Sequence, residues 1–283
     1  MGNFGHLHPA ALDIAGASGI RLRVWDYGGE GAPLLLCHCT GTLGRIWEPV
    51  IAGLSTRARI LSLDCRGHGD SNKPLGARDY AWERFAEDVL AVADSLGFGG
   101  DALAVGHSGG ATAVALAQIT RPGLFRKMAL LDAIIAPKSF FTLVSSMAES
   151  ARRRRTHFES RDAVRDRLRG KLPFSTWSPE AFEVYVIHGF ADMPDGTVQL
   201  KCPGAIEAHV YENEDTESTL SRMGQLQAPV LFAVGGASYM LEHVREQHRR
   251  TPGSRLVILE GVGHFIPQEQ PRMTADLLND WLL

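Results

Sequence analysis

The sequence predicts an open, mostly parallel α/β sheet with helices on both faces. Short, β-rich apolar runs bounded by Gly, Pro or Asp alternate with longer helical patterns along most of the chain. Continuous apolar runs of this length are typical of strands buried on both faces of a parallel sheet. Their alternation with helices indicates an α/β architecture. The one long interruption, from about residue 137 to residue 225, predicts an insertion between two strands.

The first strand candidate differs from the later ones. Residues 20–28, IRLRVWDYG, alternate between polar and apolar side chains like a half-buried strand. The later candidates are continuous apolar runs at residues 33–38, 58–64, 101–107, 128–132, 229–236 and 255–261. The helix candidates between them are residues 82–96, 109–120, 239–250 and 272–282.

The insertion shows mainly helical patterns and no strand run of the kind found elsewhere. Its clearest helix begins after Ser178 as N-cap, has Pro179 at the first helical position, and stops at Gly189. We interpret residues 137–225 as a helical cap, or lid, and residues 1–136 and 226–283 as one core domain. The basic run at residues 152–155 is interpreted as a solvated helix face, with a binding patch as the alternative.

The composition is that of an ordinary globular protein, with 45% hydrophobic residues and a net charge of −3 over 283 residues. A nucleic acid or an anionic membrane attracts a strongly basic face, and this balance indicates neither partner. No stretch reaches the ~18 apolar residues of a membrane span, and residues 1–16 lack the pattern of a signal peptide. We expect a cytoplasmic protein with a small-molecule partner; a homodimer is compatible with the sequence. The cysteines suggest no disulfide framework or zinc spacing; they are Cys37, Cys39, Cys65 and Cys202.

The motif GHSGG at residues 106–110 carries the first sign of chemistry. It follows the apolar run DALAV and precedes a helix of small residues. A nucleophile on a sharp strand-to-helix turn needs glycines on both sides, and the helix N-terminus directs free N–H groups at the reacting centre. Ser108 is therefore the candidate nucleophile, and the N–H of Gly109 is a candidate donor to an oxyanion.

His264 is the candidate base. A serine hydroxyl is a poor nucleophile unless a neighbouring base takes its proton, and imidazole titrates in the right range. His264 lies in the loop GVGHF between the last strand candidate and the final helix. This position gives the chain order nucleophile, acid, histidine.

Two other loops follow strand candidates near the start of the chain. In CHCTGT, residues 37–42, the position of Thr40 makes its backbone N–H the second candidate donor to an oxyanion. The alternative is that these residues form only a turn. The polar, Gly-rich loop DCRGHGDSNKP, residues 64–74, is assigned a structural role in bracing its neighbours.

Four motifs together, HCTGT, DCRGHGDS, GHSGG and GVGHFIPQEQP, resemble the α/β-hydrolase fold superfamily in order and spacing. The resemblance covers residues 20–283. It implies an eight-stranded, mostly parallel sheet with a helical cap after the sixth strand. It also implies Ser108 as nucleophile, His264 as base, and the N–H groups of Thr40 and Gly109 as an oxyanion hole. Where the family usually has a glycine after the oxyanion-loop histidine, this chain has Cys39.

The third member of a triad is left open between two carboxylates. A Ser–His pair needs an acid that holds the imidazole tautomer and stabilises the imidazolium. In most relatives this acid follows the seventh strand, where this chain has Ser238; Glu242 lies a further turn into a helix. Some members place the acid after the sixth strand, where Asp132 stands. We favour Asp132, with Glu242 or a triad without an acid as the alternatives.

These residues predict a serine hydrolase that cleaves an ester, lactone or thioester through an acyl-enzyme on Ser108. Family members that open epoxides or displace halide use aspartate at this position, so those reactions are disfavoured. The cap is rich in large apolar residues, which indicates a small to medium, mainly apolar acyl substrate. We expect no metal and no cofactor. The alternatives are a non-catalytic receptor on the same scaffold, a C–C bond hydrolase, an acyltransferase or a cofactor-free lyase.

Overall fold

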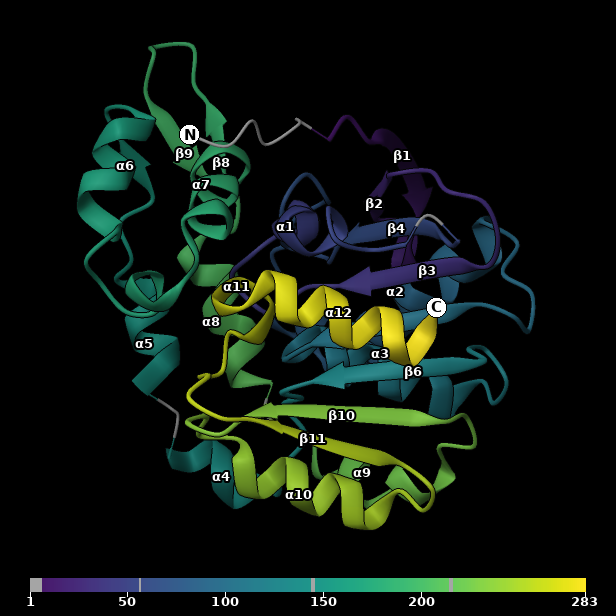
Figure 1. Ribbon diagram of the computed structural model, residues 1–283. Helices are drawn as coiled ribbons and strands as arrows, with labels where there is room; N and C mark the ends of the chain where they lie inside the picture. Colours follow the sequence, from purple (N-terminus) through teal and green to yellow (C-terminus); the bar gives the residue numbers. More distant parts are fainter. Residues whose placement is uncertain (1–6, 56, 144–145, 214–215) are drawn as a thin grey trace.

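The computed structural model describes residues 7–55, 57–143, 146–213 and 216–283. The first six residues, on which part of the expectation about a targeting segment rests, lie outside these ranges. In the described part of the chain, eight strands form the central sheet in the order β1-β2-β4-β3-β5-β6-β10-β11 (Figure 1). All neighbouring strands from β4 to β11 run parallel, and β2 pairs antiparallel with both β1 and β4. The predicted mostly parallel α/β sheet is confirmed.

The strands follow the predicted apolar runs closely. Their bounds are β1 Ala10–Ala15, β2 Arg21–Asp26, β3 Pro33–Cys37, β4 Arg59–Asp64, β5 Leu103–His107, β6 Lys127–Leu131, β10 Val230–Gly235 and β11 Arg255–Leu259. The strand missing from the prediction is β1. It lies at the edge of the sheet, and within it only Ile14 is buried, so its sequence lacks the apolar signal that marks a central strand.

Helices cover both faces of the sheet. On one face α2 (Trp82–Ser95), α3 (Gly109–Thr120) and α10 (Leu241–Arg250) pack in a single apolar cluster with Leu35 of β3. On the other face α1 (Glu48–Ile51) and α12 (Pro271–Leu282) pack with Leu34 and Leu36. Because successive side chains of a strand point to opposite faces, the continuous apolar run of β3 supplies both layers.

The segment between β6 and β10 holds most of the remaining helices. Those helices are α4 Lys138–Leu143, α5 Ser146–Arg152, α6 Arg161–Leu168, α7 Pro179–His188, α8 Gly204–Glu212 and α9 Glu217–Ser221. Ser178 is the N-cap residue of α7 as expected, since its Oγ accepts the N–H of Ala181. In Figure 1 the helices α5, α6, α7 and α8 of this segment lie on the side toward which the arrows of β3, β6 and β10 point, which is the carboxyl end of the sheet.

The segment also contains short strands that the sequence did not predict. Three short antiparallel strands pair in the order β7-β9-β8: β7 His157–Phe158, β9 Val198–Leu200 and β8 Phe190–Asp192. Strands of two or three residues are too short to show a periodic pattern in the sequence. Among the described residues, no helix has the length and apolar character needed to span a lipid bilayer.

Candidate active site

Ser108 sits on the predicted sharp turn between β5 and α3. Its backbone has φ 55° and ψ −120°, a strained conformation for a residue with a side chain. The turn is closed by two close backbone approaches. A Cβ on Gly106 would lie 2.3 Å from Ala111 Cα, and one on Gly110 would lie 2.4 Å from the carbonyl oxygen of Cys37. Glycine at these two positions is therefore what lets the turn pack against β3 and raise Ser108 above the sheet.

The structure brings Ser108, His264 and Asp132 together in one hydrogen-bonded chain. His264 Nε2 lies 3.0 Å from Ser108 Oγ, and its Nδ1 lies 2.7 Å from Asp132 Oδ1. Since a carboxylate only accepts, Nδ1 carries the proton and Nε2 accepts the serine hydroxyl. All three residues are buried, and Asp132 has no exposed surface. Proton transfer from Ser108 to His264 is geometrically prepared, with the carboxylate placed to stabilise the imidazolium.

Asp132 is held by the loop where most relatives would carry the acid. Its Oδ2 accepts the N–H of Gly235 at 3.0 Å, and its Oδ1 accepts the hydroxyl of Ser238 at 2.6 Å. The residue adopts φ 48°, and its own N–H donates to Ala233 on β10. Ser238, at the position where most relatives would carry the acid, therefore donates a hydrogen bond to the Asp132 carboxylate instead. Glu242 is exposed and pairs with Arg245, away from His264.

A second histidine positions the loop that carries His264. His107 Nε2 lies 2.9 Å from the carbonyl oxygen of His264, so this nitrogen donates. Burial lowers the pKa of His107 to about 3, with the nearby His264 ring as the second cause. His107 is therefore neutral at pH 7, and its hydrogen bond fixes the backbone of the base. Sequence reasoning missed this role, because the x position of the G-x-S-x-G motif does not specify a residue type.

The two candidate oxyanion donors lie next to each other. A Cβ on Gly109 would come within 2.9 Å of Thr40 Oγ1. Gly109 is the first residue of α3, so its N–H has no partner within the helix. Within the described part of the chain, the N–H of Thr40 also donates no hydrogen bond to the protein. Both groups are thus available to a negative charge that develops beside Ser108.

The loop after β4 braces the loop that carries Thr40. His68 Nε2 accepts the N–H of Gly41 at 3.0 Å, and His38 Nε2 accepts the N–H of Cys65 at 3.0 Å. Burial is the main cause that lowers the pKa of both imidazoles, that of His68 to about 4. Each ring is therefore neutral at pH 7 and can accept an N–H. These contacts support the structural role predicted for residues 64–74.

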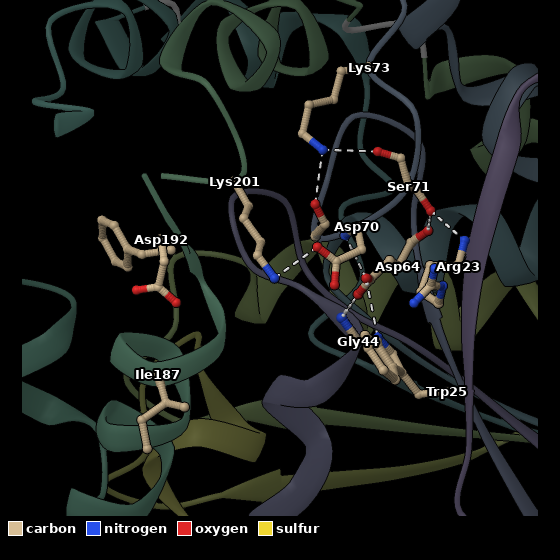
Figure 2. A network of polar contacts seen from close by, with 12 residues as sticks. Arg23, Trp25, Gly44, Asp64, Asp70, Ser71, Lys73, Ile187, Asp192 and Lys201 are labelled. Atoms are coloured by element: carbon tan, nitrogen blue, oxygen red, sulfur yellow. Dashed lines mark hydrogen bonds and ion pairs between the residues drawn. The ribbon is translucent and has the colours of Figure 1, made fainter. Parts of the chain in front are cut away.

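Asp64 anchors the same loop from below. Its carboxylate accepts the N–H of Gly44 at 2.6 Å, the N–H of Asp70 at 2.8 Å and the indole N–H of Trp25 at 3.2 Å. Figure 2 shows the residues that donate to the buried Asp64 carboxylate around it, with Lys201 pairing to Asp70 alongside. Burial raises the pKa of Asp64, and the N–H donors oppose that shift. The network ties β2 and β4 to the loop that follows β3.

A cavity opens above Ser108. It encloses about 620 Å³ of empty space, counting the part that is open to solvent, and its walls are mainly apolar. Trp82, Ile134, Phe140 and Val210 contribute to these walls. Tyr239 stacks on His264 with ring centres 4.8 Å apart. A mainly apolar group attached to a carbonyl fits such walls.

A neighbouring cavity contains charged residues that sequence reasoning missed. It is lined by aromatic side chains and by Arg154 and Glu207. Arg154 belongs to the basic run that we interpreted as a solvated helix face. Arg152, Arg153 and Arg155 are solvated as expected, with side chains 42%, 75% and 51% exposed. The expected helix face is wrong beyond Arg152, where α5 ends and the chain turns. The Arg154 side chain is 33% exposed and lines the cavity beside Glu207.

Among the described residues, no group of three or more His, Cys, Asp or Glu side chains is arranged to hold a metal ion. All four cysteines are buried free thiols. Cys39 lines the cavity beside Thr40, where burial raises the pKa of its thiol to about 12. A thiol with this pKa stays protonated at neutral pH and is a poor nucleophile.

Comparison with known proteins agrees with this fold. A family model described as alpha/beta hydrolase family matches residues 34–277. The chain therefore belongs to the alpha/beta hydrolase family. It is 24% identical over 261 residues to 2-(acetamidomethylene)succinate hydrolase of Mesorhizobium japonicum, an alignment that covers 90% of this chain and 89% of the relative.

Solved structures share the fold at low sequence identity. A crystal structure of E-2-(acetamidomethylene)succinate hydrolase superposes with a TM-score of 0.84 at 23% identity, and the match covers 97% of this chain and 99% of the other. The enol-lactonase from Burkholderia xenovorans LB400 gives a TM-score of 0.72 at 21% identity, covering 96% and 99%.

Proposed function

We propose that this chain is a serine hydrolase that cleaves an ester-type bond, namely that of a carboxylic ester, a lactone or a thioester. The observation that carries the proposal is the unbroken hydrogen-bonded chain from Ser108 through His264 to Asp132. It lies at the base of an apolar cavity and next to two backbone N–H groups. Nucleophile, base, acid and charge-stabilising donors are thus present in one place.

Acylation uses these groups in turn. Ser108 Oγ attacks the carbonyl carbon while His264 Nε2 takes the hydroxyl proton, and Asp132 stabilises the imidazolium. The N–H groups of Thr40 and Gly109 donate to the oxyanion of the tetrahedral intermediate. As the intermediate collapses, His264 gives its proton to the leaving alcohol or thiol. The acyl group remains on Ser108.

Deacylation repeats the same steps with water. His264 takes a proton from the water that attacks the acyl carbonyl, and the same donors hold the second oxyanion. Collapse returns the proton to Ser108 Oγ and releases a carboxylic acid. A mainly apolar acyl group is favoured because Ile134, Phe140 and Val210 line the cavity.

Amide-type cleavage is the second candidate. The relative from Mesorhizobium japonicum is named for a substrate with an acetamido group, and an amide can follow the same acyl-enzyme route with an amine as leaving group. Ester-type bonds remain our first choice because they need less activation of the leaving group, so the site can cleave them without a further acid. The enol-lactonase, which shares this fold, is named for the cleavage of a lactone, one of these ester-type bonds.

The test is a panel of p-nitrophenyl esters, thioesters, lactones and acetamido compounds, assayed with the wild type and with Ser108→Ala. We expect turnover of one ester-type class and a loss of about 10³-fold or more in kcat for Ser108→Ala. A fluorophosphonate should label Ser108. Tight binding of the panel without turnover or labelling would favour a receptor, and turnover confined to acetamido compounds would favour the second candidate.

We further propose that residues 137–225 act as the cap over the site, since Phe140, Met147 and Val210 from this segment line the cavity. Residues 1–136 and 226–283 then form the core. We also propose a cytoplasmic location, which the four free thiols favour. The proposed partner is a small-molecule substrate; size-exclusion chromatography with light scattering tests whether the chain forms a homodimer.

A further inference from the structure

The cavity that contains Arg154 adjoins the candidate active site. The two cavities share five lining residues, which are Thr40, Met147, Tyr211, Tyr239 and Phe265. One of these, Thr40, also supplies the proposed oxyanion donor. A substrate whose carbonyl lies beside Ser108 can therefore extend past Thr40 into the second cavity.

Arg154 faces this second cavity with most of its donors unused. Its Nη1 lies 2.7 Å from Glu207 Oε2, as an ion pair whose geometry is not that of a hydrogen bond. In the described ranges, no N–H of the Arg154 side chain donates to any other protein atom. A guanidinium carries five N–H donors in a planar fork. Such a fork can pair with a carboxylate through two parallel hydrogen bonds.

Glu207 fixes Arg154 beside the oxyanion loop. It lies on α8, and only 3% of its side chain is exposed. Its Oε1 accepts the hydroxyl of Tyr211 at 3.1 Å, and a Cβ on Gly41 would come within 2.8 Å of the same oxygen. The ion pair therefore lies beside Gly41, which follows Thr40 in the chain. Glu207 offsets the cost of burying the guanidinium when no substrate is present.

We propose that Arg154 binds a carboxylate group of the substrate, several bonds from the carbonyl that Ser108 attacks. This inference rests on the proposed function and adds the class of substrate, a mainly apolar acyl compound that bears one carboxylate. Three other residues that line the cavity, Phe174, Trp177 and Tyr185, are aromatic. The Arg154 side chain is 33% exposed, so the rings and Glu207 shield the guanidinium only in part, and partial desolvation strengthens its pairing with an anion.

The first test measures binding without turnover. In the full-length Ser108→Ala protein, calorimetry compares monomethyl glutarate, which carries a carboxylate, with the neutral ester methyl valerate. We expect Arg154→Gln to weaken the binding of monomethyl glutarate by roughly tenfold or more, while the binding of methyl valerate changes less than about twofold. Equal binding of monomethyl glutarate with and without Arg154, or no binding of it, would overturn the proposal.

The matched control is Arg152→Gln. Arg152 belongs to the same basic run and pairs with Glu212 on the surface, so its loss should change the binding of neither ligand. Arg154→Lys keeps the charge but loses the fork, and we expect intermediate binding of monomethyl glutarate. If Arg154→Gln fails to fold, salt decides the question. Raising the salt concentration from about 20 mM to about 500 mM should weaken only the anionic ligand, and no salt effect would contradict the proposal.

A kinetic measurement separates this proposal from the proposed function. In the wild-type enzyme, which retains Ser108, kcat/KM for mono-p-nitrophenyl glutarate should exceed that for p-nitrophenyl valerate. Arg154→Gln should remove this difference, mainly by raising KM for the glutarate ester. If neither ester is cleaved but monomethyl glutarate still binds through Arg154, the proposed function fails and this inference stands. If both esters are cleaved equally well, with or without Arg154, the inference fails and the proposed function stands.

Discussion

At the scale of single residues, the hydrogen-bond partners of Asp132 are what make it our proposed acid of the site. Asp132 has three donors, namely the Gly235 N–H, the Ser238 hydroxyl and the His264 Nδ1–H. A carboxylate that accepts several hydrogen bonds is held in one orientation. The sequence could show only that Ser238 occupies the usual acid position and that Asp132 ends a strand.

The corresponding prediction concerns two carboxylates. Asp132→Asn should lower kcat by about 10³- to 10⁴-fold, because a neutral amide neither selects the Nδ1–H tautomer nor stabilises the imidazolium. Glu242→Gln, at an exposed carboxylate paired with Arg245, should leave kcat within about twofold of the wild type. Steady-state kinetics on the best ester of the panel measure both. A large loss in Glu242→Gln with little effect in Asp132→Asn would move the acid to the other loop.

At the scale of elements, the turn between β5 and α3 depends on space as well as on conformation. Gly110 lies in the first turn of α3. A Cβ at this position would lie 2.4 Å from the carbonyl oxygen of Cys37 and 2.6 Å from that of His38. These are backbone atoms at the end of β3 and cannot rotate away. The turn that carries Ser108 and the loop that carries Thr40 are therefore packed against each other through this glycine.

Gly110→Ala should accordingly separate the two elements. We expect a loss of about 1–3 kcal/mol or more in the free energy of unfolding, and a loss of activity larger than the loss of folded protein explains. Gly100→Ala is the matched control, since a Cβ there meets nothing within 4 Å. Urea unfolding and kcat/KM measure the two effects. Wild-type activity in Gly110→Ala would show that the packing is looser than described.

At the scale of the whole molecule, buried neutral histidines connect the loops at the carboxyl end of the sheet. His38 and His68 accept backbone N–H groups, and His107 donates to the backbone of His264. Burial lowers the pKa of each ring. A histidine with a lowered pKa in the folded state binds more protons when the chain is unfolded. Its contribution to stability therefore falls as the pH drops below about 6.5.

For His68 this loss should occur between about pH 6.5 and its folded pKa of about 4. Over that window the wild type should lose up to ~1.4 kcal/mol per pH unit more than His68→Gln, which has no proton to gain. Urea unfolding at several pH values measures the difference. At pH 7.5 the difference in unfolding free energy between the two proteins reports the lost packing and hydrogen bonds of the imidazole, and it should narrow as the pH falls. A gap that does not change with pH would show that His68 is not buried neutral.

Most of the architecture could be predicted from the sequence, because buried strands and amphipathic helices leave local patterns. The strand from Leu103 to His107 and the helix from Gly109 to Thr120 are cases in which pattern and structure coincide. The edge strand β1 and the short strands β7 to β9 were missed because few of their residues are buried or because they are too short to show a period. Local sequence carries no other signal for them.

The sequence by itself determined the sheet, the serine on its turn and the histidine after the last strand, since each depends on residues that are neighbours along the chain. Only the tertiary structure decided that Asp132 meets His264 and Ser238, because β6 and β10 must pair in parallel before residues 106 apart can form a hydrogen bond. The tertiary structure also decided that Arg154, alone in its basic run, turns toward the cavity. The physical reason is the same in both cases: the partner of a buried charge is selected by packing between distant elements.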